Sequence, residues 1–339
     1  ELRGCLLELS QDPHGTRVAQ KVVEEAVRRG MVDELLEALP TQDMSSLACS
    51  VTGFHVVVKL LELLPDGMVE PLLETFCSNP KPLASDQWGC CVLKKCIDRS
   101  QGTLRDRLVD TITENIPQLV EDPFGNYVVQ HLILMGEKRP TEYVTRVIDS
   151  LQGLMLDLCF QKFSSNVLEK CLQNSSDSDR NKIINELLNG SEKCPPSEAV
   201  RKIIFHQFGN YVFQQALEVA QEPQFSLLVE HSKQHIQDMV CRNLPPKEKK
   251  EKPADAQGGD LPVVSTADAD ALLSPVGSLS LEHAKRLATK LVKKYPALAW
   301  GLAPEALGLG VGGVAGWYCD HFSAYAQGDY AQGDYDAAW

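Results

Sequence analysis

The stretch Gly125-Asn126-Tyr127-Val128-Val129-Gln130-His131 is one of six copies of a seven-residue pattern, Gly-x-x-Val-x-x-Lys with variants. The second residue of each copy is, in order, Thr16, Phe54, Cys90, Asn126, Ser165 and Asn210. Successive members of this series are 38, 36, 36, 39 and 45 positions apart. In and around each copy, apolar residues recur every three or four positions, as in an amphipathic helix. This period predicts a stacked α-solenoid, in which each unit buries its apolar face on its neighbours.

The chain changes character after the last copy. It has 339 residues, of which 43% are hydrophobic, and its net charge of −13 argues against a non-specific nucleic-acid binder. Residues 244–253 form a charged run bounded by prolines, and Ala, Gly, Asp and Ser are common beyond it. We therefore expect helical repeats over 1–243, a linker over 244–280, and a largely disordered tail over 281–339 with one amphipathic helix at 281–294.

Three positions of each copy are expected on one helix face. The first position is the residue after the glycine, the second is the next residue, and the third lies four residues beyond the first. First and third positions are neighbours because residues i and i+4 are adjacent on a helix, and the two apolar residues between them are expected in the core. In the last three copies the first and third positions are Asn126 and Gln130, Ser165 and Glu169, and Asn210 and Gln214; the second positions are Tyr127, Asn166 and Tyr211.

These side chains match the hydrogen-bonding edges of nucleobases. Uracil offers one N–H between two carbonyls, which suits two amides that each donate and accept. Guanine offers two adjacent donors, which suits a carboxylate such as Glu169. A second-position side chain can stack on a base, worth about 1–3 kcal/mol per base. In a single repeat such residues more often cap or solvate a helix, but three sets in register favour base recognition.

Segments 122–131, 162–171 and 207–215 closely resemble the last three repeats of the PUF (Pumilio and FBF) family. PUF repeats recognise one RNA base per helical repeat with two or three side chains. The resemblance covers roughly residues 1–242 and implies a right-handed, curved, all-α solenoid of Pumilio-type repeats. The three sets are similar to those with which the family binds U, G and U. Family domains run antiparallel to RNA, so the implied core is 5′-UGU, with its 5′ end at the sixth repeat.

The first and third repeats resemble adenine-binding sets. Their residues are Thr16, Arg17 and Gln20, with Arg17 as the stacking residue, and Cys90, Cys91 and Lys94, with Cys91 in the stacking position. Lys94 stands where the family has Gln. Because lysine can only donate a hydrogen bond, it would discriminate less between bases.

The second repeat has lost its polar base-edge residues. Phe54 and Val58 cannot hydrogen-bond to a base, so we expect His55 to stack on a base that is not specified. Family domains usually have eight repeats and six are counted here, so the resemblance implies that the first two are missing from this sequence.

A basic column follows the third positions and is expected to face RNA phosphates. It consists of Lys21, Lys59, Lys95, His131 and Lys170. Ordinary solvated lysines would give the same pattern. The acidic residues are expected elsewhere, on the outer helices; they include Glu24, Glu25, Asp33, Glu34 and Glu70.

Signals for other functions are weak. A GxGxxG match at 308–313 follows no predicted strand, and the histidines lack cysteines at zinc spacing. The weakly charged stretch 298–317 contains a proline and six glycines and is a poor membrane span. We expect no enzymatic activity, no cofactor, no metal and no membrane insertion. Eleven cysteines without a CxxC pair favour reduced thiols in the cytosol or nucleus.

We expect a monomeric, cytoplasmic protein that binds single-stranded RNA, specifically 5′-UGU elements in mRNA 3′ untranslated regions. The resemblance implies translation repression or mRNA decay through recruited proteins. The alternative is a protein-binding solenoid scaffold that has lost base recognition, which the acidic charge favours. A ribosome-biogenesis relative would show degenerate sets throughout. The tail beyond residue 250 is expected to contribute little to RNA affinity, because it lacks base-contacting sets and follows a charged linker.

Overall fold

The computed structural model describes residues 5–39, 44–135, 142–191, 194–241, 280–295 and 298. In these residues the chain is helical, with an isolated bridge between Ser191 and Cys194. The helices are α1 (Leu6–Gln11), α2 (Gly15–Arg28), α3 (Val32–Glu37), α4 (Met44–Ala48), α5 (Gly53–Leu63), α6 (Asp66–Ser78), α7 (Pro80–Ala84), α8 (Gly89–Arg99), α9 (Gly102–Glu114), α10 (Ile116–Leu119), α11 (Gly125–Met135), α12 (Glu142–Ser150), α13 (Met155–Leu158), α14 (Ser164–Asn174), α15 (Asp177–Asn189), α16 (Pro196–Phe205), α17 (Gly209–Val219), α18 (Gln224–Cys241) and α20 (Leu281–Lys294). The all-α prediction is confirmed.

Each copy of the sequence pattern begins a helix, and we call these the motif helices: α2, α5, α8, α11, α14 and α17. A short helix precedes each motif helix and another helix follows it, so a repeat has three helices. The helices divide into two compact units. The first reaches Leu187 and includes Glu218–Ala220; the second comprises Leu188–Leu217 and the residues from Gln221 onward.

An aspartate sets the turn before three of the motif helices. The Oδ1 atoms of Asp12, Asp86 and Asp122 accept hydrogen bonds from the backbone N–H groups two and three residues later, at 2.6–2.9 Å. Such Asx turns hold the chain in the conformation that starts a new helix. In the sixth repeat His206 takes this place, and its Nδ1 accepts from two backbone N–H groups at 3.3 Å.

Except in the fifth repeat, a glycine at the start of the motif helix lets the preceding helix approach it closely. A Cβ atom added to Gly125 would lie 2.9 Å from the carbonyl oxygen of Leu119 in α10, closer than packed carbon atoms come. In the fifth repeat a serine occupies this position. The hydroxyl of Ser164 donates to the carbonyl of Leu158 at 2.7 Å, so a hydrogen bond replaces the bare contact.

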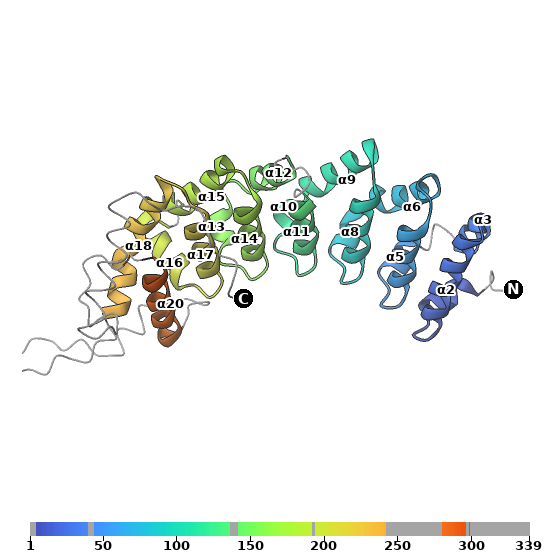
Figure 1. Cartoon of the computed structure of the whole chain (residues 1–339), viewed down its shortest axis with the longest axis horizontal. Helices are drawn as coiled ribbons and strands as arrows, with labels where there is room; N and C mark the ends of the chain where they lie inside the picture. The colour runs from blue at the N-terminus through green and yellow to red at the C-terminus, as the bar shows by residue number, and fades with distance from the viewer. Residues whose placement is uncertain are drawn as a thin grey trace, which may run out of the picture. The chain divides into compact units, whose positions relative to one another are not determined.

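Two layers of helices form the first unit (Figure 1). In one layer α2 contacts α5, α5 contacts α8, α8 contacts α11, and α11 contacts α14. In the other, α6 contacts α9 and α9 contacts α12. The apolar residues between first and third positions are fully buried in repeats two to five; they are Val56, Val57, Val92, Leu93, Val128, Val129, Val167 and Leu168.

The first repeat departs from this pattern. Val18 is 50% exposed, although Ala19 beside it is buried. The expectation that both intervening residues lie in the core is therefore wrong for Val18, because no motif helix precedes α2 in the described residues to cover it.

The second unit contains α16, most of α17, α18 and α20. Helix α20 packs on α18: the rings of Phe225 and Tyr295 are 6.1 Å apart, and the Gln237 side chain donates to the Leu298 carbonyl at 3.2 Å. The tail therefore makes contact with the repeats, contrary to the separation on which its expected small effect on RNA affinity rests. The rest of the predicted linker and tail lies outside the described residues.

Candidate nucleic-acid interface

The three positions of each motif helix differ in exposure. Most first positions are buried, and these are Thr16, Cys90, Asn126, Ser165 and Asn210. Most second positions are exposed, and these are Arg17, His55, Tyr127, Asn166 and Tyr211. The third positions are half-buried, and these are Gln20, Val58, Lys94, Gln130, Glu169 and Gln214. Because α2, α5, α8, α11 and α14 contact one another in order, the first unit brings five of the sets into one row.

Two amide pairs are preformed. The Gln130 side-chain N–H donates to Asn126 Oδ1 at 2.8 Å, and Gln214 donates to Asn210 Oδ1 at 3.0 Å. The Asn126 amide nitrogen donates to the carbonyls of Asp122 and Pro123, each at 2.9 Å.

This arrangement fixes the chemistry of each pair. The Asn126 amide nitrogen is committed to backbone carbonyls, so its oxygen is left as an acceptor and Gln130 supplies the donor. The two amides are therefore not equivalent, contrary to the expectation that each both donates and accepts. Uracil still fits, because its N–H can donate to the asparagine oxygen while one of its carbonyls accepts from the glutamine.

The fifth repeat presents a carboxylate in place of the amide. Glu169 forms no hydrogen bond or ion pair with the described residues, and burial raises its pKa, although nearby Lys170 lowers it. Ser165 donates weakly to the Lys162 carbonyl at 3.4 Å. A desolvated carboxylate without a hydrogen-bond donor is unfavourable, so the site is suited to a ligand that supplies donors.

The two adenine-type sets use their first positions inside the protein. The Thr16 hydroxyl donates to the Thr52 carbonyl in the next repeat at 2.9 Å, which leaves it only acceptor capacity. The Cys90 thiol donates to the Gln87 carbonyl at 3.4 Å, and burial raises its pKa to about 11, so it is neutral. Cys91 is half-buried, unlike the exposed residues at most other second positions.

The second repeat carries an aromatic cluster that sequence reasoning missed. Phe54 stacks on Trp88 with ring centroids 4.8 Å apart and an angle of 21° between planes, and the His55 ring lies 3.9 Å from the Phe54 ring. Trp88 precedes the glycine of the third repeat, a position that is aromatic in four repeats. That recurrence was the available signal.

All five residues of the basic column already have partners within the protein. Lys59 lies 3.4 Å from Glu24, Lys95 lies 3.0 Å from Glu62, and His131 lies 2.8 Å from Asp98. Each of these pairs joins one motif helix to the preceding one. Of the rest, Lys21 pairs with Glu24 and Lys170 donates to Gln173.

The expected place of the acidic residues is partly wrong. Glu24 and Glu25 lie on the motif helix α2, where Glu24 pairs with the basic column, whereas Asp33, Glu34 and Glu70 lie on α3 and α6 as expected. Charge pairing along the motif helices explains how acidic residues can share their face with lysines.

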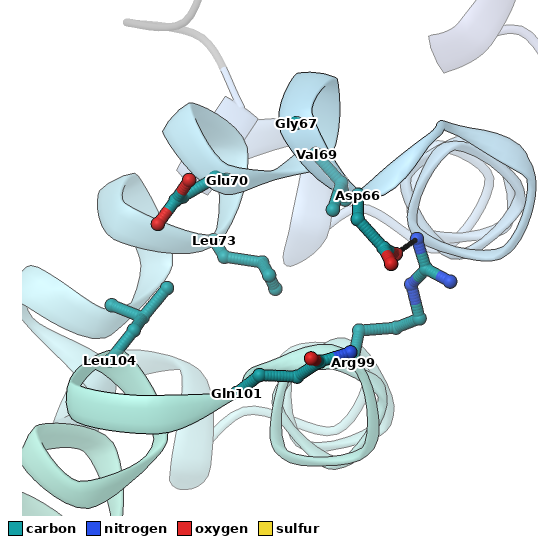
Figure 2. Close-up of a pocket in the computed structure, with 8 residues that line it drawn as sticks. All are labelled: Asp66, Gly67, Val69, Glu70, Leu73, Arg99, Gln101 and Leu104. Atoms are coloured by element: carbon teal, nitrogen blue, oxygen red, sulfur yellow. Dashed lines mark ion pairs between the residues drawn. The ribbon is translucent and has the colours of Figure 1, made fainter.

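A cavity of about 210 Å³ lies away from the motif sets, between α6 and α9 (Figure 2). Arg99 spans its edge, with an ion pair to Asp66 at 3.1 Å and a hydrogen bond to the Leu64 carbonyl at 2.7 Å. The first-, second- and third-position residues line none of it, so the candidate interface is separate from this cavity.

Among the described residues, no three His, Cys, Asp or Glu side chains gather closely enough to hold a metal ion. In the same part of the chain, no helix combines the length and apolar character needed to cross a bilayer. The GxGxxG match lies outside the described residues, as does the stretch 298–317 apart from Leu298.

The chain is similar to curated Pumilio proteins. It is 36% identical over 236 residues to Pumilio homolog 12 of Arabidopsis thaliana. The aligned residues make up 70% of this chain and 38% of that protein. A Pumilio domain-containing protein of Schizosaccharomyces pombe is 31% identical over 228 residues, covering 67% of this chain and 32% of the relative. The chain thus spans only about a third to under half of the length of such relatives.

Solved structures show the same fold. The Puf4 RNA binding domain, bound to the HO endonuclease RNA 3′ UTR recognition sequence, is 28% identical, with a TM-score of 0.63 over 72% of this chain and 74% of that one. A Puf4 mutant bound to the Cox17 RNA 3′ UTR recognition sequence is 26% identical, with a TM-score of 0.61 over 69% of this chain and 77% of that one.

The Pumilio-family RNA binding repeat matches this chain at residues 5–36, 82–113, 115–134, 155–188 and 200–231. The matched segments cover all or nearly all of five of the six motif helices, and the second repeat, with Phe54 and Val58, falls between them. With the helical repeats, the related proteins and the solenoid structures in agreement, the chain belongs to the Pumilio (PUF) family of RNA-binding repeat proteins.

Proposed function

We propose that this chain binds single-stranded RNA with a 5′-UGU core, placing one base on each of the motif helices α17, α14 and α11. Asn210 and Gln214 bind the first uracil, Ser165 and Glu169 the guanine, and Asn126 and Gln130 the second uracil. Tyr211, Asn166 and Tyr127 stack on these bases.

Glu169 carries the proposal. A carboxylate that is half-buried, without a hydrogen-bond donor and with a raised pKa opposes folding, whereas guanine would supply two donors at its Watson–Crick edge. The preformed amide pairs on α11 and α17 add the matching chemistry for uracil on either side.

The target class follows from the relatives. Puf4 is bound to 3′ UTR recognition sequences in its solved structures. We propose by similarity that this chain acts on 3′ untranslated regions of cytoplasmic mRNAs. On this proposal it lowers their translation or stability through recruited proteins, and it acts as a monomer without a catalytic step.

The test is a binding titration of labelled RNAs that differ only in the middle base. We expect UGU to be preferred over UUU by about 1–3 kcal/mol, the discrimination that a good base-edge contact gives. Equal affinity for the two RNAs would refute base recognition by Glu169.

A protein-binding scaffold is the second candidate. Lys59 and Lys95 are engaged by carboxylates, which lowers the positive charge offered to phosphates. On that alternative, substituting both Asn126 and Asn210 with Ala would leave intact the effect of the chain on mRNA translation or stability. On the proposed function it would abolish activity together with RNA binding.

A further inference from the structure

Helix α20 has two distinct faces. Ala284, Ala288, Leu291 and Val292 are buried, and they recur at the spacing of one helix face. On the other side, basic side chains recur at a similar spacing, and all are exposed: Arg286, Lys290, Lys293 and Lys294. We call these four residues the α20 basic face.

This helix is positive in a negative chain. Residues 281–294 contain five Lys or Arg and one Glu, a net charge of +4, against −13 for the whole chain. Lys290 and Lys293 form no ion pair with any described residue. Lys59 and Lys95 on the motif helices, by contrast, are paired with Glu24 and Glu62. Lys290 and Lys293 are therefore better placed to neutralise an anion than Lys59 and Lys95 are.

The position of α20 links this charge to the repeats. It packs on α18, and α18 begins only a few residues after the motif helix α17 ends, within the second unit (Figure 1). In the described residues no further repeat follows α18. RNA that continues past the base held by α17 therefore leaves the repeats at the end where α20 is docked.

We propose that the α20 basic face binds the phosphates of RNA flanking the core on the side of the sixth repeat, which is the 5′ side for the proposed UGU orientation. This inference rests on the proposed function and adds a second contact region, supplied by a segment far from the repeats in sequence. Lysine and arginine side chains bind the phosphates and not the bases. The contribution of the α20 basic face to RNA affinity is therefore independent of the flanking sequence and falls as the salt concentration rises.

The experiment compares three RNAs on the full chain: the core alone, and the core with about five added nucleotides on the 5′ or on the 3′ side, a length within the range that single-strand binding modules cover. At low salt we expect the 5′ extension to raise affinity by about tenfold and the 3′ extension to have little effect. Lys290→Glu combined with Lys293→Glu should remove this gain and lower the salt dependence, with core-only affinity unchanged.

A matched control carries the same charge change elsewhere. Lys81→Glu combined with Lys202→Glu alters two exposed lysines on α7 and α16 and should keep the gain. The proposal is overturned if the α20 variant keeps the gain, if the control loses it equally, or if the 3′ extension gives it instead. It is also overturned if vesicles of anionic lipid bind these lysines in preference to the extended RNA.

Failure of the proposed function has a different signature. A wild-type chain that does not distinguish UGU from UUU refutes base recognition. The contribution of α20 is still measured by the loss of affinity for the extended RNAs in the α20 variant.

Discussion

Gln130 and Glu169 occupy equivalent third positions on the neighbouring helices α11 and α14, yet their bonding differs. Gln130 donates to the asparagine beside it, while Glu169 has no donor among the described residues and a pKa raised by burial. The amide pair is satisfied before a ligand arrives, whereas the carboxylate is not. We therefore expect most of the discrimination between bases to come from the fifth repeat.

Ser165→Asn combined with Glu169→Gln rebuilds on α14 the amide pair of α11. The preferred middle base should change from G to U by about 1–3 kcal/mol, because a carboxylate repels the uracil carbonyls and an amide does not. Val167 and Leu168 pack the core, so the fold should be retained. Titrations with UGU and UUU RNAs at one salt concentration measure the change; a variant that still prefers UGU would contradict base recognition.

Acid should weaken binding to guanine. Guanine favours the ionised carboxylate of Glu169, so affinity for UGU should fall as pH drops through its raised pKa. Binding of UUU by the Ser165/Glu169 double variant should stay flat over the same range. Anisotropy titrations from the ordinary pKa of glutamate, about 4.3, up to neutral pH test this; parallel pH profiles for the two proteins would exclude Glu169 as the titrating group.

The raised pKa of Glu169 also predicts that the ionised carboxylate, which favours guanine binding, lowers the stability of the fold. When the pKa of a glutamate is higher in the folded than in the unfolded state, the protein loses stability as pH rises from the unfolded-state pKa through the folded-state pKa. Ionised Glu169 therefore opposes folding at neutral pH. Glu169→Gln alone should raise the free energy of unfolding by less than about 1 kcal/mol, and with it the Tm. The same variant should bind UGU RNA more weakly. A lower Tm in thermal unfolding would show that the carboxylate stabilises the fold.

At the scale of elements, each repeat depends on the close crossing of a short helix and a motif helix. Gly125 and Ser164 meet that requirement in different ways, one by lacking a side chain and the other by donating a hydrogen bond. The Asx turn before the helix fixes where it begins.

Gly125→Ala should destabilise the protein by about 1–3 kcal/mol, because the added Cβ lies 2.9 Å from the Leu119 backbone and side chain. Gly67→Ala is the matched control. It lies in α6 with no atom within 4 Å of an added Cβ, and it should stabilise the helix by up to about 1 kcal/mol. Denaturant unfolding of both variants checks this; equal effects would contradict the role of close packing.

At the scale of the molecule, ion pairs connect successive repeats in both layers of the first unit. Lys95 joins Glu62 along the motif helices, where His131 is also hydrogen-bonded to Asp98. Lys182 reaches Asp149 at 2.9 Å in the second layer. Because most of these side chains are partly exposed, each pair contributes about 0–1 kcal/mol, and their main effect is on the charge that each surface presents.

Glu62→Gln should strengthen RNA binding a few-fold at low salt, because it releases Lys95 toward phosphates, whereas Lys59 keeps its pair with Glu24; stability should change by less than about 1 kcal/mol. The slope of log affinity against log salt should steepen by about 1. Glu74→Gln, which removes a carboxylate paired with Arg107 in the second layer, is the control. Unchanged affinity and slope would show that the basic column does not face RNA.

The sequence by itself determined the repeat architecture and the candidate sets. The motif spacing fixed where each motif helix begins, since helix periodicity and turn chemistry are local properties of residues such as Asp122 and Gly125. It also placed Asn126 beside Gln130, because positions i and i+4 are always neighbours on a helix.

Only the tertiary structure decided which groups are already engaged. Three contacts join residues from different helices or repeats. Lys59 pairs with Glu24, Phe54 stacks on Trp88, and α20 packs on α18. Such contacts depend on how helices are placed in space, which the spacing of residues along one helix does not specify. For the same reason the burial of Glu169, and the direction of its pKa shift, followed from packing alone.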